Sequence, residues 1–175
     1  REVTEQGVPL LMFNNRLPDF PAHFVGTDSR TGMRRACEHL LGLGHRRIAF
    51  APGAPGDYTA ESRLEGYRDA LRGAGLEDSE LVLRSGGWEQ RFGEEAAREL
   101  LSLKDCPTAV VAANDDVAIG IYVVLRAAGV RIPEDLSLVG YSGARAGGLL
   151  ATPLTTVRQP VEALGRRAAE VALSL

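Results

Sequence analysis

Short polar side chains and one large aromatic side chain follow four apolar runs of this sequence, in the segments 52–59, 85–89, 114–116 and 142–144. The candidate residues in these segments are Asp57, Thr59, Trp88, Asn114, Asp115 and Ser142. A flat apolar surface beside short hydrogen-bonding groups suits a compact polar solute, such as a polyol, a sugar or a purine-sized ring. Arg63, about one helical turn beyond Thr59, could add a planar fork of donors. The pattern predicts a small-molecule binding site.

Each of these residues also has a purely structural interpretation. Asp57 and Thr59 would form a turn and a helix cap, and the Asp115–Asp116 pair would cap the next helix. A lone tryptophan such as Trp88 packs into a core more often than it contacts a ligand, and Arg63 would lie on the surface. The binding interpretation is favoured by the shared position of the set, since its members follow successive strands.

The strongest resemblance to a catalytic motif is Gly140-Tyr141-Ser142-Gly143, which follows an apolar run as the nucleophile turn of a hydrolase does. Ala144 stands where that motif has glycine, and no Asp or His lies downstream of Ser142 to supply an acid and a base. The glycine-rich segment 53–56 lacks the Lys–Ser/Thr pair of a phosphate-binding loop. We therefore expect no enzyme activity.

The histidines and cysteines show no metal-ligand spacing. His39 falls within a helix-period segment and His45 precedes an apolar run, so we expect structural roles for both, and His23 has no partner nearby in the sequence. Cys37 lies on the apolar face of that segment, and Cys106 belongs to no Cys/His set. We expect buried thiols in a reducing cytoplasm, with a disulfide between them as the less favoured alternative, and no metal or cofactor.

Apolar runs alternate with helix-period segments along most of the chain, which predicts parallel strands joined by crossover helices. The expected strands cover residues 8–13, 47–51, 81–84, 108–113 and 136–141, with a short strand or hinge at 154–157. The expected fold class is therefore α/β, with an open parallel sheet and helices on both faces. In such a sheet, ligands bind outside the carboxyl ends of the strands, where the candidate loops meet.

Apolar residues at helical spacing predict five helices. The first follows Asp28 or Ser29 and ends near Gly44, and the second runs from about Ala60 to Gly75. The third and fourth carry the apolar sets that begin with Phe92 and with Val117. The apolar positions of the last helix are Val161, Leu164, Ala168, Val171 and Leu175. We expect this helix and the first strand to belong to a second lobe, and the helix to keep an uncovered apolar patch.

Composition excludes some classes of protein. The 175 residues are 45% hydrophobic, enough for a sizeable core, and the formal net charge is −3 with basic and acidic residues interspersed. No concentrated basic surface for nucleic acid is therefore expected in this chain. No apolar run approaches the roughly 20 residues of a membrane helix. Because an apolar run follows Arg1 almost at once, the sequence reads as a segment of a larger protein.

Five segments, in this order and spacing, resemble the LacI/GalR family of bacterial transcription regulators. They are EHLLGLGHRRIAF, ESRLEGYRDAL, PTAVVAANDDVAIG, GVRIPEDLSLVGY and PLTTVRQP, and they extend over nearly the whole chain. The resemblance implies a periplasmic-binding-protein-like type I sensor with two lobes, each flavodoxin-like, and an effector held between them. It also implies a homodimer and a separate amino-terminal helix-turn-helix domain that reads operator DNA.

By alignment to the motifs of that family, seven positions would contact the effector. These are Asn14, Asp57, Thr59, Arg63, Trp88, Asn114 and Ser142. Arg63 would clamp oxygens, Trp88 would stack on the ligand, and Asn114 would bind a polar edge. The family commonly has Asp-Asp after the VGY motif, whereas this chain has Ser142-Gly143. Loss of that carboxylate should weaken or redirect the binding of vicinal hydroxyls.

We accordingly expect residues 28–154 to form the carboxy-terminal lobe, and residues 1–27 and 155–175 to form hinge segments and part of the amino-terminal lobe. The expected function is a cytoplasmic sensor for a sugar, nucleoside or organic acid, acting on operator DNA through a DNA-binding domain that lies outside this chain. A periplasmic sugar-binding protein of a transporter is the main alternative. An esterase using Ser142 and a pure dimerisation fragment are the others.

Overall fold

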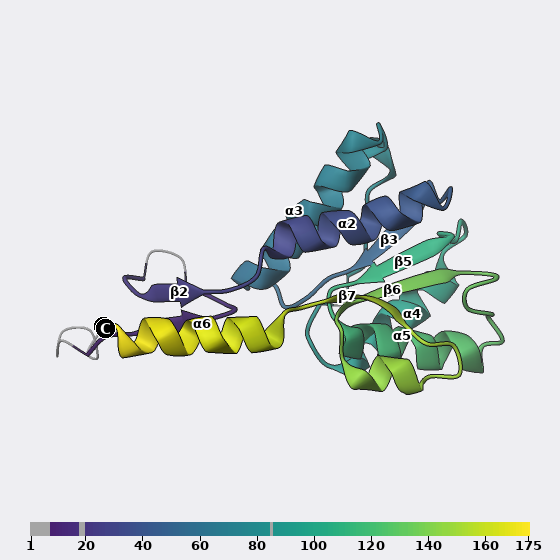
Figure 1. Cartoon of the computed structure of the whole chain (residues 1–175). Helices are drawn as coiled ribbons and strands as arrows, with labels where there is room; N and C mark the ends of the chain where they lie inside the picture. Colours follow the sequence, from purple (N-terminus) through teal and green to yellow (C-terminus); the bar gives the residue numbers. More distant parts are fainter. Residues whose placement is uncertain (1–7, 18–19, 85) are drawn as a thin grey trace.

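The computed structural model describes residues 8–17, 20–84 and 86–175. The part of the expected amino-terminal lobe before Val8, and Ser85 of one candidate loop, lie outside these residues. A larger lobe is built on a parallel sheet, and a smaller one holds two short strands and the last helix (Figure 1). Within the described ranges, no helix is long and apolar enough to cross a bilayer.

Five parallel strands form the large sheet in the order β4-β3-β5-β6-β7. Their bounds are β3 Ile48–Ala51, β4 Leu81–Val82, β5 Ala109–Ala112, β6 Ser137–Ser142 and β7 Thr155–Arg158. The α/β parallel sheet expected from the sequence is confirmed. All side chains of β3 and β5 are buried, as their uninterrupted apolar sequences require. The segment expected as a short strand or hinge pairs with β6, so this sheet continues beyond Leu154 to Arg158.

Two helices cover each face of the large sheet, as Figure 1 shows. The helices are α2 Ser29–Gly42 and α3 Tyr58–Gly73 on one face, and α4 Gln90–Ser102 and α5 Asp115–Ala127 on the other. Cys37 of α2 is buried in the core between this helix layer and the sheet, and burial raises the pKa of its thiol to about 12. Cys106, which was expected to be buried, is exposed.

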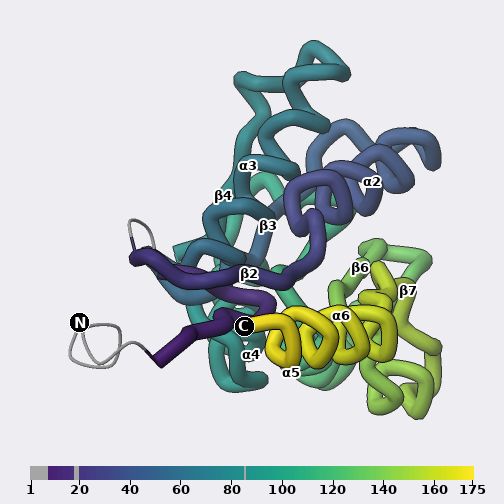
Figure 2. The backbone as a smooth tube through the Cα atoms, turned by 60° about the vertical axis from the view of Figure 1, so that its left-hand side comes forward, coloured from purple at the N-terminus to yellow at the C-terminus, as the bar shows by residue number. Residues whose placement is uncertain are grey.

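The smaller lobe pairs β1 Leu11–Phe13 in parallel with β2 His23–Val25, and α6 Val161–Leu173 packs against both strands (Figures 1 and 2). Sequence reasoning found β1 and α6 but not β2. The expectation of an uncovered apolar patch on α6 holds only in part. Val161 is 63% exposed, Val171 is half-buried, and Leu164 is only 8% exposed because it packs inward.

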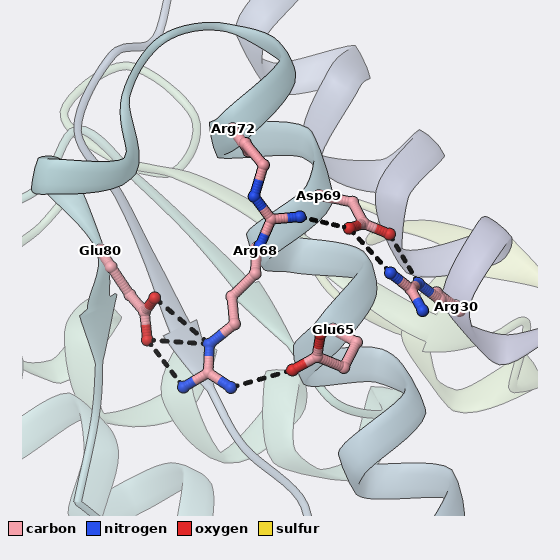
Figure 3. Close-up of polar contacts among 6 residues, drawn as sticks. All are labelled: Arg30, Glu65, Arg68, Asp69, Arg72 and Glu80. Atoms are coloured by element: carbon pink, nitrogen blue, oxygen red, sulfur yellow. Dashed lines mark hydrogen bonds and ion pairs between the residues drawn. The ribbon is translucent and has the colours of Figure 1, made fainter.

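Ion pairs join α2 to α3 on the outer surface (Figure 3). Asp69 accepts two hydrogen bonds from Arg30 of α2, at 2.6 and 2.9 Å, and one from Arg72 at 2.9 Å. The Arg30 guanidinium lowers the pKa of Asp69. Arg68 pairs with acidic residues on either side of it, Glu65 and Glu80. Because these pairs are solvent-exposed, each adds little to the stability of the fold.

His45 ties the starts of three strands together. Its Nδ1 lies 2.8 Å from Thr108 Oγ1 and its Nε2 lies 3.0 Å from Ser137 Oγ. Desolvation by burial lowers the pKa of this imidazole, so the folded chain binds the proton less readily than the unfolded chain does. The structural role expected for His45 agrees with these contacts.

Acidification is expected to destabilise the fold modestly through His45. Its contribution is present above the ordinary histidine pKa of about 6.5 and is lost as the pH falls through the lowered pKa of the folded state. Urea midpoints measured on either side of that pH should show the loss. His45→Gln should remove part of it, whereas His39→Gln, an exposed change on α2, should not. Equal pH dependence in all three proteins would contradict the assignment.

Candidate functional site

A cavity of about 440 Å³ lies at the carboxyl ends of the large sheet, where the smaller lobe meets it. Its volume is within the range of small-molecule sites. The seven residues aligned to the effector contacts of the family line it, namely Asn14, Asp57, Thr59, Arg63, Trp88, Asn114 and Ser142, whereas Asp115, the further candidate, does not. The rule that ligands bind beyond the carboxyl ends of parallel strands, here called the strand-end rule, selected most of these residues in the larger lobe, and the family resemblance added Asn14 of the smaller lobe.

Four further lining residues were not among the candidates. They are Phe13, Asn15, Asp116 and Gln159. Gln159 directly follows β7, so the strand-end rule would have selected it had the segment at 154–157 been treated as a strand of the same sheet. Asp116 lies in a selected loop, and Phe13 and Asn15 flank Asn14.

Arg63 occupies the floor of the cavity, and the surface position that a solitary arginine would suggest is wrong. The side chain extends from α3, and the residue is only 3% exposed. Its Nη1 donates to the Ala113 carbonyl at 2.6 Å, and its guanidinium lies 4.0 Å from the centre of the Tyr141 ring and 5.3 Å from that of Trp88. Burial lowers the pKa of the guanidinium.

The buried charge of Arg63 is incompletely matched by the protein. Among the described residues, Nε has no hydrogen-bond partner, and no carboxylate lies within 4.0 Å of the guanidinium. Two aromatic faces offset part of the cost of burying this cation. A buried cation that lacks a carboxylate partner is costly unless something else supplies compensating oxygens. The arrangement suits a solute that presents acceptor oxygens to the cavity.

Trp88 and Asn114 hold each other in place. Asn114 Nδ2 donates to the Trp88 carbonyl at 2.8 Å, and Asn114 Oδ1 accepts from Val117 N at 2.8 Å as the N-cap of α5. The cap is thus Asn114 itself and not either aspartate of the Asp115–Asp116 pair. Gly53 allows the indole to lie close, since a Cβ there would be 2.5 Å from the Trp88 ring. The half-buried indole is left as one wall of the cavity.

Asp57 caps a helix, as its structural interpretation predicted, and it also lines the cavity. Its Oδ1 caps α3 by accepting from Thr59 N at 2.8 Å and from Ala60 N at 3.0 Å. Its Oδ2 accepts from Asn15 Nδ2 at 2.6 Å, which joins the two lobes. The carboxylate is therefore held rigidly between a helix amino terminus and the smaller lobe.

Ser142 donates its hydroxyl hydrogen bond to Asp115 Oδ2 at 3.0 Å. Asp115 is 1% exposed and also accepts from Ala144 N and from Thr156 Oγ1, each at 2.6 Å. The Ser142 hydroxyl is thus engaged with a carboxylate, and among the described residues no histidine or lysine contacts it as a serine nucleophile would require. Its role at the cavity is that of a positioned polar group.

Two segments of the described chain cross between the lobes beside the cavity, one from β2 to α2 and one from β7 to α6, and a hydrogen-bonded cluster links both to Asn14. Thr27 Oγ1 donates to Asn14 Oδ1 at 3.2 Å, and Gln159 Nε2 donates to Thr27 Oγ1 at 3.0 Å. Thr59 Oγ1 donates to the Asn14 carbonyl at 2.7 Å. Asn14 has φ of 58°, a left-handed conformation that asparagine tolerates better than most residues. The relative position of the lobes is thus tied to residues that line the cavity.

Sequence comparison gives the context of this site. Residues 37–175 match the family described as a periplasmic binding protein-like domain. The chain is 37% identical to the HTH-type transcriptional regulator CelR of Thermobifida fusca, over 95% of this chain and 50% of that protein. It is 35% identical to the ribose operon repressor of Escherichia coli, over 94% of this chain and 50% of that protein. The chain thus spans about half the length of these relatives.

Solved structures show the same architecture. A LacI family transcriptional regulator from Enterococcus faecium with bound ribose superposes with a TM-score of 0.89 at 31% identity, over 98% of this chain and 63% of that one. A complex of the transcriptional regulator CelR with cellobiose gives a TM-score of 0.88 at 35% identity, over 98% of this chain and 53% of that one. The periplasmic-binding-protein-like fold expected from the sequence is confirmed.

Proposed function

Because the chain belongs to the periplasmic binding protein-like family, and within it to the LacI/GalR regulators, we propose that it is the sensor part of a transcription regulator. A small-molecule effector binds in the 440 Å³ cavity between the lobes. The observation that carries this proposal is the convergence of seven residues, chosen from sequence, on one cavity that spans both lobes. The chain is not an enzyme in this proposal, in line with the regulators it resembles.

The effector would act by changing the angle between the lobes. It contacts Asn14 and Gln159 at the hinge and Arg63 in the larger lobe, so binding favours one arrangement of the hinge cluster. In a homodimer, that change alters the spacing of two helix-turn-helix domains on operator DNA. Such a coupling is typically about 1 to 3 kcal/mol, and it is reciprocal between effector and DNA.

Residues 28–154 form the core of the carboxy-terminal lobe in this proposal, and the sheet pairing of β7 extends it to Arg158. We therefore place the end of the carboxy-terminal lobe at Arg158, four residues beyond the boundary expected at 154. Residues 8–17 and 20–27, together with α6, belong to the amino-terminal lobe and the hinge.

The proposed effector is a sugar or a related metabolite. The structural neighbours with bound ribose and bound cellobiose support a hydroxylated compound of that size. Arg63 offers donors to its oxygens, and Trp88 offers a flat wall for its carbon face. The Ser142 hydroxyl already donates a hydrogen bond to Asp115. We therefore expect this position to select a vicinal diol less strongly than a free carboxylate at the same position would.

Arg63→Met is expected to weaken effector binding at least tenfold, which corresponds to about 1.4 kcal/mol. The substitution removes the donors that face the cavity but keeps a side chain of similar length. The measurement is the rise in melting temperature caused by ribose, cellobiose, nucleosides and organic acids, compared between variant and parent. Because the rise is measured for each protein against its own melting temperature without ligand, a change in basal stability does not enter the comparison.

Arg72→Met is the matched control, since Arg72 lies on the same helix but is exposed and pairs with Asp69. It should leave the ligand-induced rise unchanged. A compound that stabilises the parent chain and the Arg63→Met variant equally would place the effector elsewhere. Failure of the whole panel to stabilise the parent chain would contradict the sensor proposal.

A further inference from the structure

Gln159 lines a second cavity as well as the first. This cavity, of about 460 Å³, lies between the start of α2, the end of β7 and the first turns of α6, so it too spans both lobes. Among the described lining residues, Gln159 is the only one that the two cavities share. The second cavity is therefore a separate space on the hinge, and none of the seven candidate residues lines it.

One part of the second cavity is apolar. Val25 and Leu164 are each 8% exposed, and Tyr141 is 2% exposed. Val157 and Pro160 complete this part of the lining. A hydrocarbon or aromatic body of modest size would be removed from water here, which favours its binding in proportion to the apolar area buried.

The other part is cationic. Arg35, Arg158 and Arg167 line the cavity, against one aspartate, Asp28. Within the described residues, no carboxylate lies within 4.0 Å of Arg35 or Arg158, whereas Arg167 pairs with Glu170 at 3.1 Å. Two guanidinium groups from different elements thus face one hollow without an ion-pair partner in the protein.

Asp28 does not neutralise this charge fully. Its Oδ1 accepts from Thr31 N at 2.9 Å as the N-cap of α2. This hydrogen bond holds the pKa of Asp28 below its usual value, and the carboxylate is committed to the helix terminus. With Glu170 paired to Arg167, three arginines stand against two carboxylates, so the local charge stays positive.

We propose that the second cavity binds a compact organic anion, in which a carboxylate or phosphate group contacts Arg35 and Arg158 and an apolar body lies against Val25, Val157 and Leu164. Guanidinium groups bind both kinds of anion with paired, charge-assisted hydrogen bonds. The volume of the cavity is that of a small-molecule site, and its apolar and cationic halves fit one amphipathic solute.

The two cavities are physically connected through Gln159. Its Nε2 donates to Thr27 Oγ1 at 3.0 Å and lies 3.5 Å from Asn14 Oδ1. Thr27 lines the second cavity and Asn14 lines the first. A solute that draws Gln159 or Thr27 toward the second cavity must change the bonds that hold Asn14. Occupancy of one cavity is therefore coupled to the geometry of the other.

Phenyl phosphate is a suitable probe, because it joins a small aromatic body to an anion. Titrated into the 175-residue chain, it should cause saturable shifts of the backbone amide NMR signals of Gly26, Thr31 and Leu164. Inorganic phosphate lacks the apolar body and benzyl alcohol lacks the charge, so each should bind at least tenfold more weakly. Trp88 lines only the first cavity and is the only tryptophan, so a change in its emission at saturation reports the coupling.

The double substitution Arg35→Gln with Arg158→Gln should weaken phenyl phosphate binding at least tenfold. Both side chains are exposed, so the amide spectrum of the variant should show an intact fold. The matched control is Arg34→Gln with Arg166→Gln, which changes neighbouring arginines of α2 and α6 that do not line the cavity. The control should bind as the parent does.

Three results would overturn the site. They are the absence of saturable shifts at millimolar phenyl phosphate, equal binding by the parent and the Arg35/Arg158 variant, and shifts centred on Asn114 and Arg63 in place of the second cavity. Unchanged Trp88 emission at saturation would overturn the coupling. Failure of this site can be told apart from failure of the proposed effector site, because no residue altered here lines the first cavity.

Discussion

Asp115→Ala is expected to destabilise the fold by about 3 kcal/mol, a large effect for one side chain. The Asp115 carboxylate is 1% exposed and accepts hydrogen bonds from Ser142, Ala144 and Thr156. Each hydrogen bond to a charged group contributes about 1.5 to 3 kcal/mol, and the half-buried Ala144 N–H would lose its partner. Re-pairing of the two hydroxyls with water offsets part of the total.

The loss should be structural as well as energetic. Asp115 opens α5, Ser142 ends β6 and Thr156 lies in β7, so this carboxylate holds three elements at one edge of the sheet. Urea unfolding followed by circular dichroism measures the stability, and Asp116→Ala is the matched control because Asp116 is the exposed next residue. The control should change stability by no more than about 0.5 kcal/mol. Similar midpoints for the two variants would contradict the role given to Asp115.

Much of the large lobe could be predicted from sequence because its strands are buried on both faces. The apolar runs around β3 and β5 have no polar alternation, which is what a sheet covered by two helix layers requires. The start of α2 was also readable, since Asp28, one of its two expected caps, caps it with its side chain. The cap of α5 is Asn114, however, and not Asp115 or Asp116 as expected. α3 begins at Tyr58, before the expected Ala60, because its cap is Asp57.

The smaller lobe was harder to predict, since its strands carry weaker signals. β2 is three residues long, and two of its side chains, His23 and Phe24, are exposed, so no apolar run marks it. β1 is shorter than the apolar run that predicted it. The burial of Leu164 was missed for a related reason, because α6 packs on β1 and β2, and β2 had not been recognised.

The strand-end rule predicts which residues lie near the candidate cavity, but not the hydrogen bonds that their polar atoms make. The rule places Trp88, Asn114 and Ser142 at one edge of the sheet from their position in the sequence alone. It does not tell which of their polar atoms are already engaged within the protein. The Asn114 amide is used on Trp88 and on α5, and the Ser142 hydroxyl is used on Asp115. Only coordinates show that Arg63 retains a buried nitrogen without a partner.

Gly120→Ala is expected to destabilise the fold by about 3 kcal/mol, because α4 and α5 cross in backbone contact at this glycine. A Cβ added to Gly120 would lie 2.1 Å from the carbonyl oxygen of Gln90, and one added to Gly93 would lie 2.0 Å from that of Val117. Backbone atoms cannot rotate away as a flexible side chain can, so the helices must separate. We therefore place the cost at the upper end of the usual range for overpacking, about 1 to 3 kcal/mol.

Gly165→Ala, also inside a helix, is the matched control and is expected to stabilise the fold. A Cβ at Gly165 of α6 would have no atom within 4 Å, so the substitution adds helix propensity without a clash. It should raise stability by up to about 1 kcal/mol. Urea midpoints of the two variants should move in opposite directions from the parent. A Gly120→Ala protein as stable as the parent would mean that α4 and α5 are not in backbone contact. In that case the positions of Trp88 and Asn114, which lie at the amino termini of these helices and form one wall of the cavity, would also be wrong.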